Sequence, residues 1–258
     1  MASLWSESSP EAWQAALDGY SEAVAGKGKE GLPELDRWFH EELPAALRTR
    51  QPPHMTQPEL VKLVDWKLKR GKWRPRLLDF AKQADPAAVE AASRAAFAAL
   101  AGSGGSAGSG GKASSKAGGK VKAGGAEGGS SEASGRQEAP QPTEAAIKQA
   151  LAELCVLKGV GPATASAALE AFDPSVPFSS DEAMLAALNS KDYTVPKVLE
   201  LTAALRNKAA ALSKASGRQW TPREVEQALF AAAVGGGCSA AAAGGSAGAS
   251  RSGKKRKR

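Results

Sequence analysis

The chain has 258 residues, with 34 lysine and arginine residues against 27 aspartate and glutamate residues, which gives a net charge of +7. Only two cysteines are present, so a structural disulfide is not expected and a four-cysteine iron–sulfur cluster is excluded. His40 and His54 are the only histidines, and we expect no metal site and no cofactor. No apolar run has membrane length, so we expect no membrane partner.

The composition is uneven along the chain. Residues 102–140 are nearly all Gly, Ser, Ala and Lys, and residues 234–250 are nearly all Ala, Gly and Ser. Neither stretch can bury enough apolar surface to offset chain entropy, so we expect a disordered linker and a disordered tail. The predicted organisation is an N-terminal helical part at 1–101, a linker at 102–140, a second helical part at 141–233 and a tail at 234–258. The second helical part has few large aromatic residues, so a core of its own would be thin, although possible.

Two prolines mark the first expected helices. One helix begins at Pro10 and ends in the loop at 26–28, and another begins at Pro33. Their apolar residues recur at helical spacing: Trp13, Ala16, Leu17, Tyr20 and Val24, then Leu35, Trp38, Phe39 and Leu43. We interpret these tryptophans as core residues, although a tryptophan can also stack on a nucleobase.

The segment 66–76 is rich in basic and aromatic residues. It follows the start of a helix at the capping box Thr56-Gln57-Pro58-Glu59, and Gly71 marks the expected helix end. Basic side chains interleaved with aromatics suit phosphate and base-stacking contacts. The charges can also complement the helix dipole or form a solvated face, with Trp66 packed inside. The candidate nucleic-acid contacts are Lys69, Arg70, Lys72, Trp73, Arg74 and Arg76.

The most informative stretch is Leu157-Lys158-Gly159-Val160-Gly161-Pro162-Ala163-Thr164-Ala165. Helical spacing of apolar residues precedes it from Thr143, and Pro162 suits the first turn of a second helix. Two glycines between two helices allow a tight turn and a close approach to a ligand, and the start of the second helix attracts an anion. A nucleic-acid phosphate fits this description, with candidate contacts at Lys158, Gly159, Val160, Gly161 and Thr164. The alternative is an ordinary connection between helices with a glycine cap.

This stretch resembles the helix-hairpin-helix motif, and its Leu-x-Gly-Val-Gly-x-x-Thr-Ala form is similar to that of the helix-hairpin-helix base-excision DNA glycosylases. The resemblance covers roughly thirty residues, and polymerases, ligases and nucleases use the same motif only for binding. It implies that the hairpin holds the phosphodiester backbone and that an aspartate downstream, here Asp181, serves the chemistry. It also implies helices on both sides of the hairpin in one bundle, so we expect 1–101 and 141–233 to form one domain with the linker as an insertion. The lysine that some members use for strand cleavage corresponds to Ala163, so lyase activity is not expected.

Three more helices are expected after the hairpin region. One is capped by Ser180, one begins near Thr194, and the last follows the capping box Thr221-Pro222-Arg223-Glu224. No alternating strand pattern occurs, so the expected fold is all-α, a multi-helix bundle that contains the hairpin. Because an acidic residue in the first turn of a helix is favoured by the dipole, we prefer a helix-start role for Asp181 over catalysis.

The chain ends in a dense basic cluster. Six basic residues and no acidic residue lie between 251 and 258, so the remaining chain is close to neutral and any DNA contact should be focal. The pattern is typical of a nuclear localisation signal or a phosphate tether, with a solubilising tail as the alternative. The residues of the cluster are Lys254, Lys255, Arg256, Lys257 and Arg258.

These features together predict a nuclear DNA-binding protein that contacts the phosphate backbone through a helix-hairpin-helix without catalysis. Protein partners in the nucleus would supply the remaining affinity. One alternative is a monofunctional DNA glycosylase that uses Asp181 and has no lyase activity. A second alternative is an RNA-associated or protein-interaction helical module.

Overall fold

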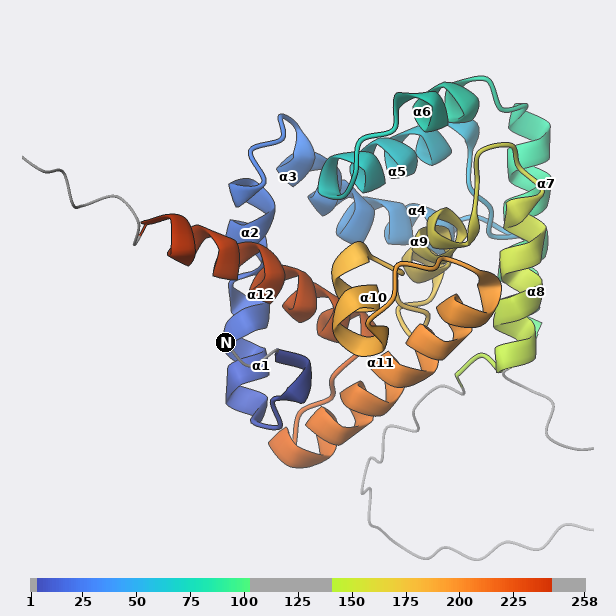
Figure 1. Cartoon of the computed structure of the whole chain (residues 1–258). Helices are drawn as coiled ribbons and strands as arrows, with labels where there is room; N and C mark the ends of the chain where they lie inside the picture. Colours follow the sequence, from blue (N-terminus) through green and yellow to red (C-terminus); the bar gives the residue numbers. More distant parts are fainter. Residues whose placement is uncertain (1–3, 103–140, 243–258) are drawn as a thin grey trace, which may run out of the picture.

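The computed structural model describes residues 4–102 and 141–242, and every regular element within these ranges is helical (Figure 1). The all-α class expected from the sequence is confirmed for these residues. The predicted linker from residue 103 onward and the basic cluster at 254–258 lie outside the described residues. The elements are η1 (Leu4–Ser6), α1 (Pro10–Asp18), α2 (Tyr20–Gly26), α3 (Leu32–Arg37), η2 (Trp38–Glu42), α4 (Leu43–Thr49), α5 (Gln57–Arg70), α6 (Pro75–Lys82), α7 (Pro86–Gly102), α8 (Glu144–Cys155), α9 (Pro162–Phe172), α10 (Asp181–Leu188), α11 (Val195–Ser216) and α12 (Pro222–Ala242).

Side-chain caps fix several of the helix starts, as the sequence predicted. In front of α5, the Thr56 backbone N–H donates to the Glu59 carboxylate at 2.8 Å, which is one half of a capping box. At α12 the Thr221 backbone N–H donates to Glu224 at 2.7 Å, and the Glu224 N–H donates to the Thr221 hydroxyl at 3.2 Å. These bonds satisfy N–H groups that the helix itself leaves unpaired.

Two segments depart from the expected helix boundaries. The helix expected to run from Pro10 to the loop at 26–28 is broken at Gly19, which separates α1 from α2, because glycine is a poor helix former. At the other end of the chain, α12 continues to Ala242, beyond the boundary at residue 233. Composition assigned this stretch to a disordered tail, and it contains three glycines at 235–237 as well as alanines, so helix propensity alone does not account for the extension.

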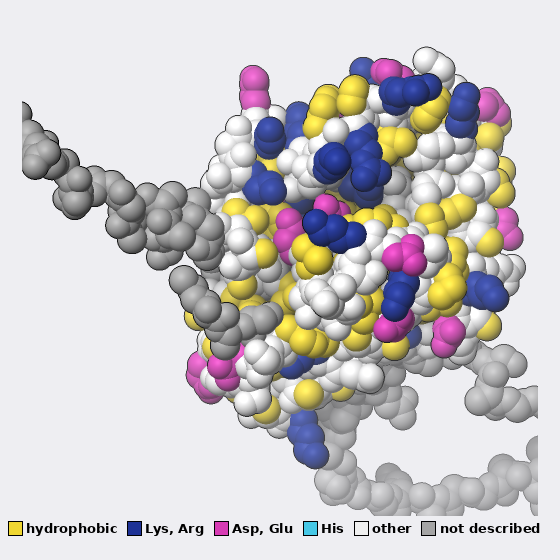
Figure 2. Space-filling model, viewed as in Figure 1, with side chains coloured by type: hydrophobic (Ala, Val, Ile, Leu, Met, Phe, Trp, Pro, Cys, Tyr) yellow, Lys and Arg dark blue, Asp and Glu magenta, His cyan; other side chains and the backbone are white. Residues whose placement is uncertain are grey.

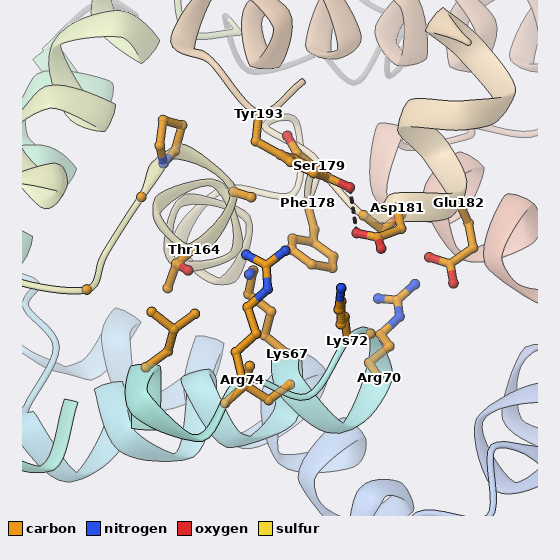
Figure 3. A pocket seen from close by; sticks show the side chains of 18 residues that line it. Lys67, Arg70, Lys72, Arg74, Thr164, Phe178, Ser179, Asp181, Glu182 and Tyr193 are labelled. Carbon is orange, nitrogen blue, oxygen red and sulfur yellow. Dashed lines mark hydrogen bonds between the residues drawn. The ribbon is translucent and has the colours of Figure 1, made fainter. Parts of the chain in front are cut away.

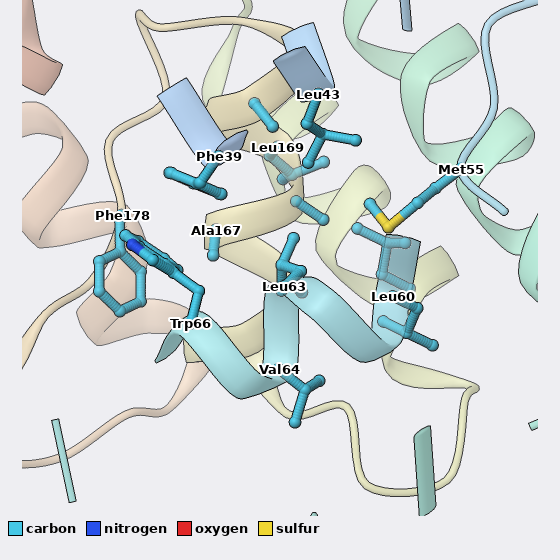
Figure 4. Packing of buried hydrophobic residues seen from close by; sticks show 14 of the residues in the cluster. Phe39, Leu43, Met55, Leu60, Leu63, Val64, Trp66, Ala167, Leu169 and Phe178 are labelled. Atoms are coloured by element: carbon cyan, nitrogen blue, oxygen red, sulfur yellow. The ribbon is translucent and has the colours of Figure 1, made fainter. Parts of the chain in front are cut away.

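Helix α9 lies at the centre of the core. Its residues from Thr164 to Ala171 are buried, and it packs against α4, α5, α7, α8 and α11. Figure 4 shows Ala167 and Leu169 of α9 among the side chains of Leu43, Phe39, Leu63 and Trp66. The rings of Phe39 and Trp66 stack with their centroids 3.8 Å apart. The buried tryptophans of this region are therefore core residues, as expected from their helical spacing.

Residues from both sides of the linker share this core. Helix α7 packs against α8, and α1 and α2 pack against α12 (Figure 1). A second buried cluster joins Trp13 of α1 to Met184 of α10 and to residues of α11 and α12. In the parts of the chain that the structure describes, no helix combines the length and apolar character needed to cross a bilayer.

Candidate nucleic-acid interface

A pocket of about 220 Å³ lies where the end of α5 meets the starts of α9 and α10 (Figure 3). We call it the cationic pocket. Its first wall carries Lys67, Arg70, Lys72 and Arg74, its second wall is the start of α9 at 161–164, and its third wall is the segment 178–182 with Tyr193. The two stretches that the sequence singled out, one basic and one glycine-rich, therefore face each other across a single pocket.

The surface around the pocket carries both charges. Lys and Arg side chains gather over the region of α5 and α6, and below them acidic side chains lie beside a hollow with basic side chains between them (Figure 2). In the close-up, Lys72 and Arg74 extend from the α5 side toward the side that carries Asp181, Glu182 and Tyr193 (Figure 3). A ligand that enters therefore meets cations on one side and carboxylates on the other.

The cationic wall results from the way in which α5 ends. The Gly71 N–H donates to the Lys67 carbonyl at 3.0 Å and closes the helix, after which residues 71–76 are exposed. Lys67 lies one turn earlier and is partly buried. Burial lowers the pKa of Lys67, repulsion from Arg74 lowers it further, and attraction to Asp181 opposes both effects.

Arg70 is the most deeply buried cation of the first wall and is only 1% exposed. Its Nη2 donates to both carboxylate oxygens of Glu226 on α12, at 2.7 and 2.8 Å. Against the effect of burial, this carboxylate raises the pKa of Arg70, so the guanidinium remains charged. Its Nε and Nη1 have no hydrogen-bond partner among the described residues, and the same holds for the buried hydroxyl of Ser179. Both side chains line the pocket, and such buried polar groups ordinarily have partners.

The two glycines of the α8–α9 connection, residues 156–161, have different roles. Gly159 has a positive φ of 85°, and a Cβ at this position would lie 2.8 Å from the Phe80 side chain. Its requirement for glycine therefore comes from the turn and from packing against α6. Gly161 has a φ of −98°, and a Cβ there would meet nothing within 4 Å. Only Gly161 presents an open face, and this face borders the pocket.

The third wall is held in place by buried polar residues of α9. The Ser179 N–H donates to the Ser166 hydroxyl at 3.0 Å, and the Phe178 N–H donates to the Glu170 carboxylate. Ser180 then caps α10 by accepting from the Ala183 N–H at 3.2 Å. The sequence carried one signal for this arrangement, because polar residues at positions 166 and 170 interrupt an otherwise apolar helix.

The carboxylates of the third wall have different environments. Asp181 is exposed at the first position of α10 and accepts a hydrogen bond from the Tyr193 hydroxyl. Burial raises the pKa of Tyr193, and the hydrogen bond to Asp181 raises it further. Glu182 is partly buried, and burial raises the pKa of its carboxyl, with Arg70 opposing. Among residues 4–102 and 141–242, no group of three or more His, Cys, Asp or Glu is placed to hold a metal ion.

The structure brings some of the predicted site residues together and separates others. Arg70, Lys72, Arg74, Gly159, Gly161, Thr164 and Asp181 all line the cationic pocket. Lys69 and Trp73 line a different hollow, Val160 is buried, and Arg76 and Lys158 are exposed outside the pocket. Lys67, Glu182 and Tyr193 also line the cationic pocket, although none of them was among the contacts predicted from the sequence. Lys67 had a detectable signal, because it lies one helical turn before Arg70, whereas Tyr193 had none.

No protein-family model, curated protein or solved structure matches the chain.

Proposed function

We propose that this protein binds DNA, with a backbone phosphate held in the cationic pocket and without cleavage of the DNA. One observation carries the proposal. The basic segment after α5 and the glycine turn before α9 are distant in sequence, yet they form facing walls of one pocket. In this proposal the α8–α9 pair acts as a helix-hairpin-helix. The protein is nuclear, and the basic cluster at 254–258 is its nuclear localisation signal.

The charges of the pocket support an anionic ligand on its first two walls. Lys72 and Arg74 are exposed and can pair with phosphate oxygens, while Lys67 provides a third cation from within the pocket. The start of α9 adds the positive end of a helix dipole, and the open face of Gly161 lets a phosphate approach the backbone. The carboxylates of Asp181 and Glu182 would repel a phosphate from the third wall, which restricts binding to one orientation.

A salt series with a matched charge control tests this proposal. The Lys72→Ala/Arg74→Ala variant removes two pocket cations, and Arg94→Ala/Lys148→Ala removes two exposed cations of α7 and α8. Removing one cation that pairs with a phosphate should flatten the plot of log K against log salt by about one unit. We expect weaker binding to duplex DNA and a flatter slope only for the pocket variant, while both variants retain the basic tail.

Two results would contradict the proposal. If both variants weaken binding equally, diffuse charge rather than the pocket binds DNA. If the full chain does not bind DNA at low salt, the proposed function is wrong, and an RNA or protein partner becomes the better hypothesis. Circular dichroism and unfolding curves must first show that each variant is folded. Both substitutions of the pocket variant lie at exposed positions, where stability changes are usually within about 0.5 kcal/mol.

A monofunctional DNA glycosylase is the second candidate, and one observation favours it. Asp181 lines the same pocket as the glycine turn, so its carboxylate could face a sugar whose phosphate the turn holds. Asp181→Asn distinguishes the two functions, because asparagine keeps the shape and can still accept from Tyr193. For the glycosylase, release of free base from damaged duplexes is abolished. For the binding protein, no base is released by either form, and DNA affinity does not fall.

A further inference from the structure

The short segment between α5 and α6, residues 71–74, separates two hollows. Gly71, Lys72 and Arg74 line the cationic pocket, whereas Trp73 lines a second hollow of about 460 Å³. The segment is neither helix nor strand, and its side chains divide between the two hollows. Trp73 therefore faces away from the cations that precede and follow it.

Trp73 differs from the other large aromatic residues of the described chain. It is 51% exposed, whereas Trp13, Trp38, Trp66 and Trp220 are at most 7% exposed. A single exposed apolar side chain is common on protein surfaces, so exposure alone indicates no function. The position of Trp73 is the informative feature, because its hollow directly adjoins the pocket for which we propose a phosphate.

The second hollow has the size and charge that suit a nucleotide base. An apolar cavity of about 150 Å³ can hold a benzene ring, so a hollow of about 460 Å³ has room for a nucleobase beside the indole. Lys29 and Lys69 line the same hollow, together with Gly31, Leu68 and one carboxylate, that of Glu30. Lys69 is paired with Asp65 at 3.1 Å, whereas Lys29 is exposed and can pair with an adjacent phosphate.

We infer that Trp73 stacks on an unpaired nucleobase of the strand whose phosphate occupies the cationic pocket. This inference rests on the proposed function. Along a DNA strand, phosphates alternate with bases. Along the segment 72–74, the cations Lys72 and Arg74, which can pair with phosphates, alternate with the indole of Trp73, which can stack on a base. Base–aromatic stacking needs a free base face, which an intact duplex does not offer at internal positions. The protein therefore prefers single-stranded or gapped DNA to intact duplex.

The test compares a thymidine oligonucleotide, the corresponding duplex and a uridine oligonucleotide, each titrated into the full chain. The variants are Trp73→Ala, Trp73→Phe and, as a control, Leu185→Ala, which removes another exposed apolar side chain. We expect Trp73→Ala to weaken single-strand binding about tenfold while duplex affinity changes little. Trp73→Phe should retain most of the affinity, and the control should match the unchanged protein. Single-strand binding should quench long-wavelength tryptophan fluorescence, and Trp73→Ala should abolish this quenching.

The outcomes separate this inference from the proposed function. If Trp73→Ala leaves the ratio of single-strand to duplex affinity unchanged while Lys72→Ala/Arg74→Ala weakens both, the stacking site is wrong and phosphate binding stands. If no nucleic acid binds, both proposals are wrong. If the uridine strand binds more tightly and loses affinity in Trp73→Ala, the stacking site stands and the assignment to DNA is overturned.

Discussion

Arg70 and Arg74 lie on the same wall of the cationic pocket, but their surroundings are opposite. Arg70 is 1% exposed, is paired with Glu226 and lies 4.2 Å from the centroid of the Phe230 ring. Arg74 is exposed and begins the first turn of α6 without a side-chain cap. The first guanidinium joins α5 to α12, and the second is free to meet a ligand.

This difference shows that the basic segment performs two tasks. Burial raises the pKa of the Glu226 carboxyl, Arg70 and then Ser180, the cap of α10, oppose this rise, and α12 packs against α10. Arg70 and Glu226 therefore fix the first wall of the pocket relative to the third. Lys72 and Arg74 lie beyond the helix end, where neither packing nor a carboxylate restrains them. Substitutions in the two groups should accordingly change different measurable properties.

The largest expected effect follows from removing one partner of the buried pair. Arg70→Ala leaves the Glu226 carboxylate buried and uncompensated, which typically costs about 3–5 kcal/mol. We expect a loss of this size in the free energy of unfolding, measured with urea. The control is Arg70→Met combined with Glu226→Leu, which removes both charges and should recover most of the loss. Equal stability of Arg70→Ala and the unchanged protein would contradict the structural role.

The glycine turn offers the same comparison between packed and open positions. Gly159→Ala forces a positive φ on alanine and places its Cβ 2.8 Å from Phe80, so we expect a loss of about 1–3 kcal/mol. Gly161→Ala meets no atom within 4 Å and should change the free energy of unfolding by less than about 0.5 kcal/mol. Gly161→Ala should still weaken DNA binding, because its methyl group occupies the open face. If Gly159→Ala has the same free energy of unfolding as the unchanged protein, the turn has shifted to accommodate the added methyl group.

The sequence predicted the parts of this structure that depend on neighbouring residues. The capping boxes at Thr56 and Thr221 and the proline at the start of α9 identified helix starts, because these signals act within one turn. The pairing of Arg70 with Glu226 spans 156 positions and depends on how α5 and α12 pack. The glycine at position 159 was attributed to a tight turn and a close ligand; its φ of 85° agrees with the turn, whereas the close neighbour is the Phe80 side chain of another helix. The neighbours of Arg70 and of Gly159 in the sequence do not indicate their contacts with Glu226 and Phe80.

A smaller effect is expected at the acidic wall of the pocket. Glu182→Gln removes a charge that repels a phosphate, and we expect about fivefold tighter DNA binding. Burial raises the pKa of Glu182 above its ordinary 4.5, so lowering the pH toward that raised value protonates the carboxyl and should tighten binding. The dissociation constants of the unchanged protein and of Glu182→Gln, measured at several pH values, isolate the contribution of the Glu182 charge. An unchanged affinity in Glu182→Gln would place the ligand away from this wall.

A last effect concerns a partly buried basic group, His40, which has no carboxylate of its own. Arg70 has Glu226, and Arg223 lies 3.0 Å from Glu170, but the nearest carboxylates to His40 lie at 3.7 and 3.9 Å and serve other partners. Burial lowers the pKa of His40 well below 6.5, and the positive charges of Arg223 and Arg70 lower it further.

The pH dependence of stability should reveal this neutral histidine. As the pH falls below 6.5, the unfolded chain binds a proton at His40 that the folded protein does not bind, so the free energy of unfolding decreases. In urea unfolding at pH values of about 7.5 and 5.5, the unchanged protein should therefore lose more stability than His40→Gln. Other buried groups titrate in both proteins, so the difference between the two isolates His40. If the free energy of unfolding depends on pH in the same way in both proteins, folding does not change the pKa of His40. Protonated His40 would then be tolerated in the folded protein without a carboxylate of its own.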